Sequence, residues 1–139
     1  MREILFRGKK TGFNEWVRGF ITSPCEKTMC VLKQINPNIE WYVDAETVGQ
    51  YTGLTDKNGT KIFEGDIGKD RGGNIHIVKY GRFTPKNFYR MFGYDTTISI
   101  YGLHTVCDEG ECLLPTNHTL EIIGNIHDNP ELLKGGERE

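Results

Sequence analysis

The sequence predicts a mainly β protein, and three features of its 139 residues support that fold class. Isoleucine, threonine, valine and the aromatic residues together number 47, whereas alanine occurs once, at Ala45. These β-branched and aromatic side chains favour strands, and the lack of alanine disfavours helices. Seventeen glycines and five prolines provide frequent turns, which favours many short strands. The length fits a single domain, or one domain with a small appendage.

The first third of the chain predicts short strands separated by loops. Runs of apolar and aromatic residues bounded by turn residues predict strands at residues 4–7, 15–21, 31–35 and 41–43. The polar stretch at 9–12 predicts a hairpin between the first two strands. Asp44 is expected to cap a short helical turn over 44–48, because its carboxylate can accept from the free N–H groups of that turn.

The clearest local motif is Asn58-Gly59, which predicts a type I′ hairpin turn because both central residues need positive φ. We expect strands on both sides of this turn, the second continuing from Lys61 through Phe63 into residues 64–67. Further strands are predicted at residues 75–80, 97–106 and 119–126. Asn129 and Pro130 begin a helical turn as cap and first residue, and the charged tail from Lys134 is expected to fray.

Charge and compartment narrow the function classes. No apolar run approaches the roughly 20 residues that span a bilayer, and the N-terminus lacks the apolar core of a signal peptide. We therefore expect a cytoplasmic protein with no membrane partner and with its four cysteines as thiols. Residues 1–94 have a net charge of +5 and residues 95–139 one of −7. The two parts either attract each other within one fold or present a basic face to an acidic partner.

The cysteines form two pairs of C-x₄-C spacing, which makes them weak candidates for a zinc site. The candidate ligands are Cys25, Cys30, Cys107 and Cys112. The alternative is ordinary, half-buried thiols. His104 lies on an apolar strand face, where a hydrogen-bonded core histidine is the favoured interpretation. The sequence contains neither phosphate-cradle motif and no nucleophile signature. We therefore expect no enzymatic activity and no cofactor.

Residues 79–94 combine four basic residues with six aromatic residues and contain no acid. Basic groups neutralise phosphates and aromatic rings stack on bases, so this composition is typical of a surface for single-stranded nucleic acid. The alternative is that the aromatic rings fill the core. The residues that we single out for nucleic acid or another partner are Lys79, Arg82, Lys86, Arg90, Phe88 and Tyr89.

Three segments carry a resemblance to a known family. Residues 46–67, which include Gln50-Tyr51-Thr52-Gly53-Leu54 and Glu64-Gly65-Asp66-Ile67, closely resemble the signature of the YopX protein family, of the form QYTGLKDKNGKxIxEGDIV. Residues 121–133 resemble its closing motif and residues 2–7 its opening. The chain departs from the usual form at Gly68, where valine is commoner, and at Thr55, where lysine is usual.

The resemblance implies a bacteriophage or prophage protein with an SH3-like β-barrel and no established activity. We place this barrel core at residues 44–133 with short helical turns, after an N-terminal β-hairpin appendage at residues 1–43. A flexible tail is expected at 134–139. The resemblance carries over no functional residue.

The signature also has a structural interpretation of its own. Gly53, Gly59 and Gly65 suit turn positions, and Glu64 and Asp66 can accept hydrogen bonds from backbone amides there. The alternative is a binding surface at this loop.

Together these observations predict a non-enzymatic accessory protein in the cytoplasm of the bacterial host. It would be a small β-barrel module that binds an unknown host or phage protein or assembles with itself as a homo-oligomer. The alternative is a nucleic-acid-binding module that uses residues 79–94.

Overall fold

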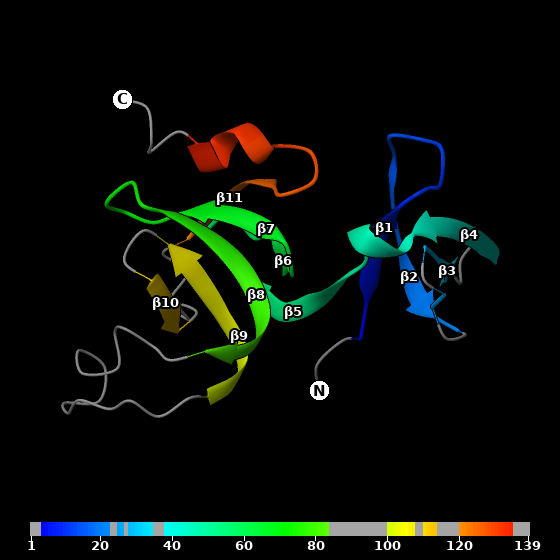
Figure 1. Cartoon of the computed structure of the whole chain (residues 1–139), viewed down its shortest axis with the longest axis horizontal. Coiled ribbons are helices and arrows are strands. Elements are labelled where there is room, and N and C mark those ends of the chain that lie inside the picture. Colours follow the sequence, from blue (N-terminus) through cyan, green and yellow to red (C-terminus); the bar gives the residue numbers. More distant parts are fainter. Residues whose placement is uncertain are drawn as a thin grey trace. The chain divides into compact units, whose positions relative to one another are not determined.

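The computed structural model describes residues 4–22, 25–26, 28–34, 38–83, 100–107, 110–113 and 120–134. The chain divides into two compact units, Met1–Gly53 and Leu54–Glu139. Both units consist of antiparallel strands, and the short helices in the described residues are two 3₁₀ turns (Figure 1). The mainly β fold class with short helical turns is therefore confirmed. The sequence placed the boundary between appendage and core at residues 43 and 44, and the division between the two units follows Gly53.

Unit 1 contributes five strands, in the order β4-β3-β2-β1-β5, to an antiparallel sheet whose last strand is β6 (Lys61–Phe63). Its elements are β1 (Phe6–Lys9), β2 (Trp16–Ile21), β3 (Met29–Gln34), β4 (Ile39–Asp44), the 3₁₀ turn η1 (Ala45–Thr47) and β5 (Gly49–Thr55). All the strands predicted from the sequence are present, and β3 and β4 each extend beyond the predicted range. β5 runs past the end of the unit to the signature hairpin.

The sheet of unit 1 curls until β4 reaches the end of β1. Lys10 forms a bridge with Val43, and the Thr11 N–H donates to the Tyr42 carbonyl at 2.9 Å. Gly8 permits this approach, since a Cβ at its position would lie 3.0 Å from Val43. The inward side chains form a core of Val17, Cys30, Leu32 and Val43. Residues of one strand alternate in direction, so the residues between them point outward.

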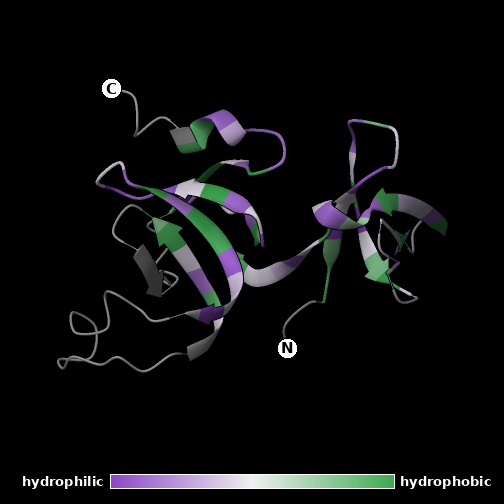
Figure 2. Ribbon diagram, in the orientation of Figure 1, coloured by the Kyte–Doolittle hydropathy of each residue, from purple (hydrophilic) through white to green (hydrophobic). Residues whose placement is uncertain are grey.

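Unit 2 contains an antiparallel sheet with the strand order β10-β9-β8-β7-β11. Its elements are β6 (Lys61–Phe63), β7 (Asp66–Lys69), β8 (Ile75–Phe83), β9 (Ile100–Cys107), β10 (Gly110–Leu113), β11 (Glu121–Asn125) and the 3₁₀ turn η2 (Pro130–Lys134). Hydrophobic and hydrophilic bands alternate along β8 and β9, as expected for strands with one buried face (Figure 2). Among the described residues of this unit, the buried apolar side chains are those of Ile62, Phe63, Ile67, Val78 and Leu120.

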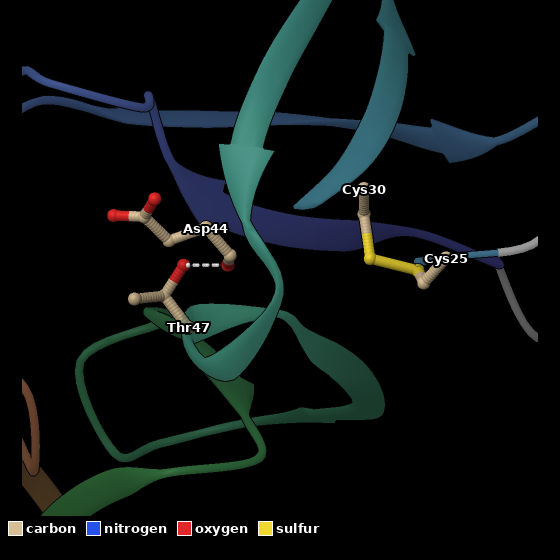
Figure 3. The surroundings of a disulfide bond; sticks show 4 residues. All are labelled: Cys25, Cys30, Asp44 and Thr47. Atoms are coloured by element: carbon tan, nitrogen blue, oxygen red, sulfur yellow. Dashed lines mark hydrogen bonds between the residues drawn. A yellow bond between two sulfur atoms is a disulfide. The ribbon is translucent and has the colours of Figure 1, made fainter. Parts of the chain in front are cut away.

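Several local predictions differ from the structure. The strand predicted from Lys61 to Ile67 is broken at Glu64 and Gly65, because Gly65 has φ +92° and the Asp66 carboxylate accepts the Phe63 N–H at 2.7 Å. Residues 110–113 form a strand, β10, that the sequence did not predict. The Asp44 carboxylate does not cap η1. Instead, the Thr47 hydroxyl donates to the Asp44 carbonyl at 2.7 Å (Figure 3).

Candidate functional site

The β1–β2 hairpin presents an aromatic side chain at its tip. The Phe13 N–H donates to the Lys10 carbonyl, and the Lys10 N–H donates to the Glu15 carbonyl, both at 3.0 Å. Gly12 has φ +81°, which the third residue of a type II turn requires. The turn therefore holds Phe13 away from the core, and its side chain is 66% exposed.

A pocket of about 350 Å³ lies where this hairpin meets β4. Its lining residues come from two segments that are distant in the sequence: Lys10, Thr11 and Phe13 from the hairpin, and Glu40, Trp41 and Tyr42 from β4. The contact between Thr11 and Tyr42 brings the two segments together. Tyr42 is 63% exposed, so two exposed aromatic rings line the same pocket.

The Lys10 ammonium is held against the aromatic residues of this pocket. Its Nζ lies 4.1 Å from the centroid of the Trp41 ring and 5.5 Å from that of Phe13. It also forms an ion pair with the Glu15 carboxylate at 3.0 Å. The Trp41 ring is fixed in turn by its Nε1–H, which donates to the Gln34 side chain at 3.3 Å. The pocket thus combines aromatic faces with a cation that is already neutralised.

The sequence patterns do not predict this pocket, although one residue indicates it. Phe13 is an aromatic residue in an otherwise polar hairpin, between Gly12 and Asn14. An aromatic ring at the tip of a polar loop lies away from the core and indicates a surface contact. Its partners in the pocket lie almost thirty residues away, and only the curl of the sheet reveals them.

The structure places only part of the basic aromatic segment. Lys79 and Arg82 lie on β8 and are exposed, as is Tyr80 between them. Because strand residues alternate, Tyr80 and Arg82 share one face and Lys79 points to the other. The remaining predicted residues lie outside the described residues: Lys86, Phe88, Tyr89 and Arg90.

The expectation of free thiols is wrong for two of the four cysteines. Cys25 and Cys30 form a disulfide across the β2–β3 connection, where their Cα atoms lie 4.4 Å apart (Figure 3). The bond removes both residues from the proposed set of zinc thiolates, because a ligating cysteine must be a free thiolate. Cys107, on β9, is not part of a disulfide among the described residues. The side chain of Cys112 is outside the described part of the chain.

A buried histidine links three segments of unit 2. The His76 Nε2–H donates to the Asp70 carboxylate at 2.9 Å, and its Nδ1 lies 3.0 Å from the Thr105 hydroxyl. This order resembles that of a catalytic triad, but the Thr105 side chain is fully buried and cannot reach a substrate. Burial raises the pKa of Asp70, but hydrogen bonds from His76 and Asn74 outweigh it and lower the pKa overall. We therefore assign this group to packing.

His104 is also buried, and its Nδ1–H donates to the Gly102 carbonyl at 3.0 Å. The interpretation as a hydrogen-bonded core histidine is confirmed.

The signature hairpin is a structural element centred on Asp56. One carboxylate oxygen accepts the N–H groups of Asn58 and Thr60 at 2.8 and 2.9 Å, and the other accepts that of Ile122 on β11 at 2.9 Å. The Gly59 N–H bonds the Asp56 carbonyl, so the turn lies one residue earlier than the predicted type I′ turn. The turn is displaced because the Asp56 carboxylate accepts the N–H groups of both Asn58 and Thr60.

These hydrogen bonds also determine the charge state of Asp56. Burial raises its pKa, but the N–H groups of Ile122, Thr60 and Asn58, together with the charge of Lys57, outweigh burial and hold the pKa below 3.8. Gly59 and Gly65 have positive φ at turns, as predicted, and Gly53 has φ +88° within β5. The signature therefore stabilises the fold of unit 2 from within.

The comparisons with known proteins agree with this architecture. The model of the family described as YopX protein matches residues 5–134. The chain belongs to the YopX protein family. The match covers both units, from the start of the first hairpin to η2. No curated protein matches the chain.

Among solved structures, the crystal structure of protein EF1440 from Enterococcus faecalis is similar to this YopX-family chain. The TM-score is 0.50 and the identity 20%, over 96% of this chain and 99% of that one. At this identity the likeness shows the fold alone. No helix in the described part of the chain is long and apolar enough to cross a membrane.

Proposed function

We propose that this YopX-family chain is a non-enzymatic accessory protein of phage or prophage origin, active in the cytoplasm of the bacterial host. In this proposal it is a small β module that binds a protein partner through the pocket of unit 1. The observation that carries the proposal is the pair of exposed aromatic rings, Phe13 and Tyr42, beside a concave surface. Aromatic residues are enriched among the residues that contribute most to binding at protein interfaces.

A second copy of the chain is the alternative occupant of this pocket. Self-assembly would use the same exposed rings, because a two-fold interface places the same surface patch on both subunits. Light scattering during size-exclusion chromatography separates the two forms of the proposal. A monomer favours a different protein as the partner, and an oligomer favours self-assembly.

The test uses matched variants of exposed aromatic residues. Phe13→Ser and Tyr42→Ser remove the rings from the pocket, and Tyr80→Ser removes a ring that is 47% exposed on β8. Affinity capture from host lysate should yield a defined protein with the wild type and with Tyr80→Ser, and lose it with the two pocket variants. A monomer that captures nothing, or whose captured protein is unaffected by the pocket variants, contradicts the proposal.

Nucleic-acid binding by residues 79–94 is the second candidate function. It is favoured by the exposure of Tyr80 and Arg82 on one face of β8, where a ring and a cation can contact a base and a phosphate. A salt titration with labelled single-stranded oligonucleotides tests it. Binding should weaken as salt rises, and Arg82→Gln should reduce the salt dependence by about one phosphate contact.

The control for that titration is Lys57→Gln, because Lys57 is an exposed cation of the same unit outside this segment. It should leave oligonucleotide binding nearly unchanged. Absence of binding at low salt rejects the second candidate. Equal losses from the two variants would indicate a diffuse electrostatic contact instead of a site on β8.

A further inference from the structure

The pocket of unit 1 already shows that its aromatic faces hold a cation. Lys10 Nζ sits over Trp41 and faces Phe13, and its side chain is only 18% exposed. The face of an aromatic ring carries the negative part of its quadrupole, so it attracts cations and repels anions. The same preference applies to the exposed rings of Phe13 and Tyr42.

The charges around the pocket point to the same class of ligand. The Glu15 carboxylate, 3.0 Å from Lys10, cancels the charge of that lysine. Glu40 also lines the pocket, is exposed, and forms no ion pair with the other residues that the structure describes. Beside the neutralised Lys10–Glu15 pair, Glu40 therefore places a further carboxylate next to the aromatic rings, with Lys33 of β3 as its cross-strand neighbour. An acidic ligand would meet repulsion from both.

We propose that this pocket binds an arginine side chain of the protein partner. The inference rests on the proposed function and names the chemistry that the partner presents. A planar guanidinium stacks on aromatic rings and forms two parallel hydrogen bonds with a carboxylate, which a lysine ammonium cannot do. A volume of about 350 Å³ is at the lower end of the range for ligand sites, which suits one side chain with its flanking backbone.

The test is a titration of the full-length, ¹⁵N-labelled protein with acetyl-Gly-Arg-Gly-amide, followed by NMR. We expect saturable shifts, in the millimolar range typical of a single side chain, at the Trp41 indole N–H and at the Thr11 and Tyr42 amides. The Trp16 indole, which does not line the pocket, serves as the internal reference. The same peptide with citrulline, which keeps the shape and lacks the charge, should cause none of these shifts.

Two carboxylate variants connect the shifts to the pocket charge. Glu40→Gln should weaken binding of the arginine peptide about tenfold, because it removes the charged partner of the guanidinium. Glu46→Gln changes an exposed acid on η1 that does not line the pocket, and should leave binding unchanged. Equal effects of the two variants would overturn the proposal.

The proposal is also overturned if the arginine peptide causes no shifts, or if the citrulline peptide, an acidic peptide or an oligonucleotide binds the pocket equally well. Its failure can be told apart from failure of the proposed function. If Phe13→Ser and Tyr42→Ser release the captured protein while Glu40→Gln retains it, the pocket binds a protein without using arginine.

Discussion

Replacing Asp56 by asparagine tests the structural role assigned to the family signature. The amide oxygen can still accept the N–H groups of Asn58 and Thr60, but the amide nitrogen then faces the Ile122 N–H, donor against donor. A hydrogen bond to a charged group contributes about 1.5–3 kcal/mol, and a buried donor without a partner is costly. We expect Asp56→Asn to lower the free energy of unfolding by about 2–3 kcal/mol, and Asp56→Ala by about 4 kcal/mol.

Urea unfolding measures this loss, and two signals separate the units. Both tryptophans, Trp16 and Trp41, lie in unit 1, so their fluorescence reports on that unit, whereas far-UV circular dichroism reports on both. The far-UV transition of Asp56→Asn should move to lower urea. Asp44→Asn is the control, because the Asp44 carboxylate caps nothing, and it should change stability by no more than about 0.5 kcal/mol. An unchanged far-UV transition for Asp56→Asn would refute the reasoning.

The stability that the Asp56 carboxylate contributes should depend on pH. The pKa of Asp56 in the folded protein is below the ordinary value of 3.8, so the stabilisation is complete above 3.8 and is lost as the pH falls through the lowered pKa. The difference in unfolding free energy between wild type and Asp56→Asn should therefore shrink in acid. The variant keeps some acid dependence, since the pKa of Asp70 is also lowered. A difference that stays constant with pH would contradict the assigned pKa shift.

Two further predictions concern packing and the disulfide. Gly68→Val should lower the free energy of unfolding by about 2 kcal/mol, because even a Cβ there would lie 2.6 Å from Leu120 Cγ. Leu120→Ala frees this space, so the double variant should lose at least about 1 kcal/mol less than the sum of the two single losses. Additive urea unfolding energies would show that the two residues do not compete for this space. Cys25→Ser should destabilise unit 1 by about 2 kcal/mol, the chain-entropy value for a six-residue loop, and make its tryptophan-monitored unfolding insensitive to reductant. A wild-type transition that reductant does not move would contradict a stabilising disulfide.

The fold class and most strands were predictable because they depend on local patterns. The glycines at positions 59 and 65 have the positive φ that their turn motifs require. The errors arose where side chains compete for backbone amides. Asp56 moves its turn by one residue, and Asp66 breaks the expected strand, since each carboxylate captures N–H groups that an uninterrupted pattern leaves free. The alternation of apolar and polar residues predicts which side chains are buried, but it does not show which carboxylates accept backbone N–H groups.

The candidate site could not be predicted, for a different physical reason. Its two halves, around Phe13 and around Trp41, meet only because β4 pairs back onto the end of β1 at Lys10 and Val43. Pairing over such a sequence distance depends on the curl of the whole sheet, which Gly8 permits and no short motif specifies. The disulfide was not predicted because a reducing cytoplasm was expected, and this compartment favours thiols at Cys25 and Cys30.

The family signature and the unit 1 pocket differ in whether their polar groups are buried or exposed. The most distinctive motif of the YopX family places Asp56 and Asp66 in the interior, where their carboxylates bond the backbone of their own unit. Groups used in this way cannot also contact a partner. The exposed groups of the unit 1 pocket, Phe13, Glu40 and Tyr42, contribute little to the core, because their side chains remain largely in water. Changing them therefore costs the fold little. Under the proposed function, differences in partner between members of the family should arise at this pocket and not in the signature.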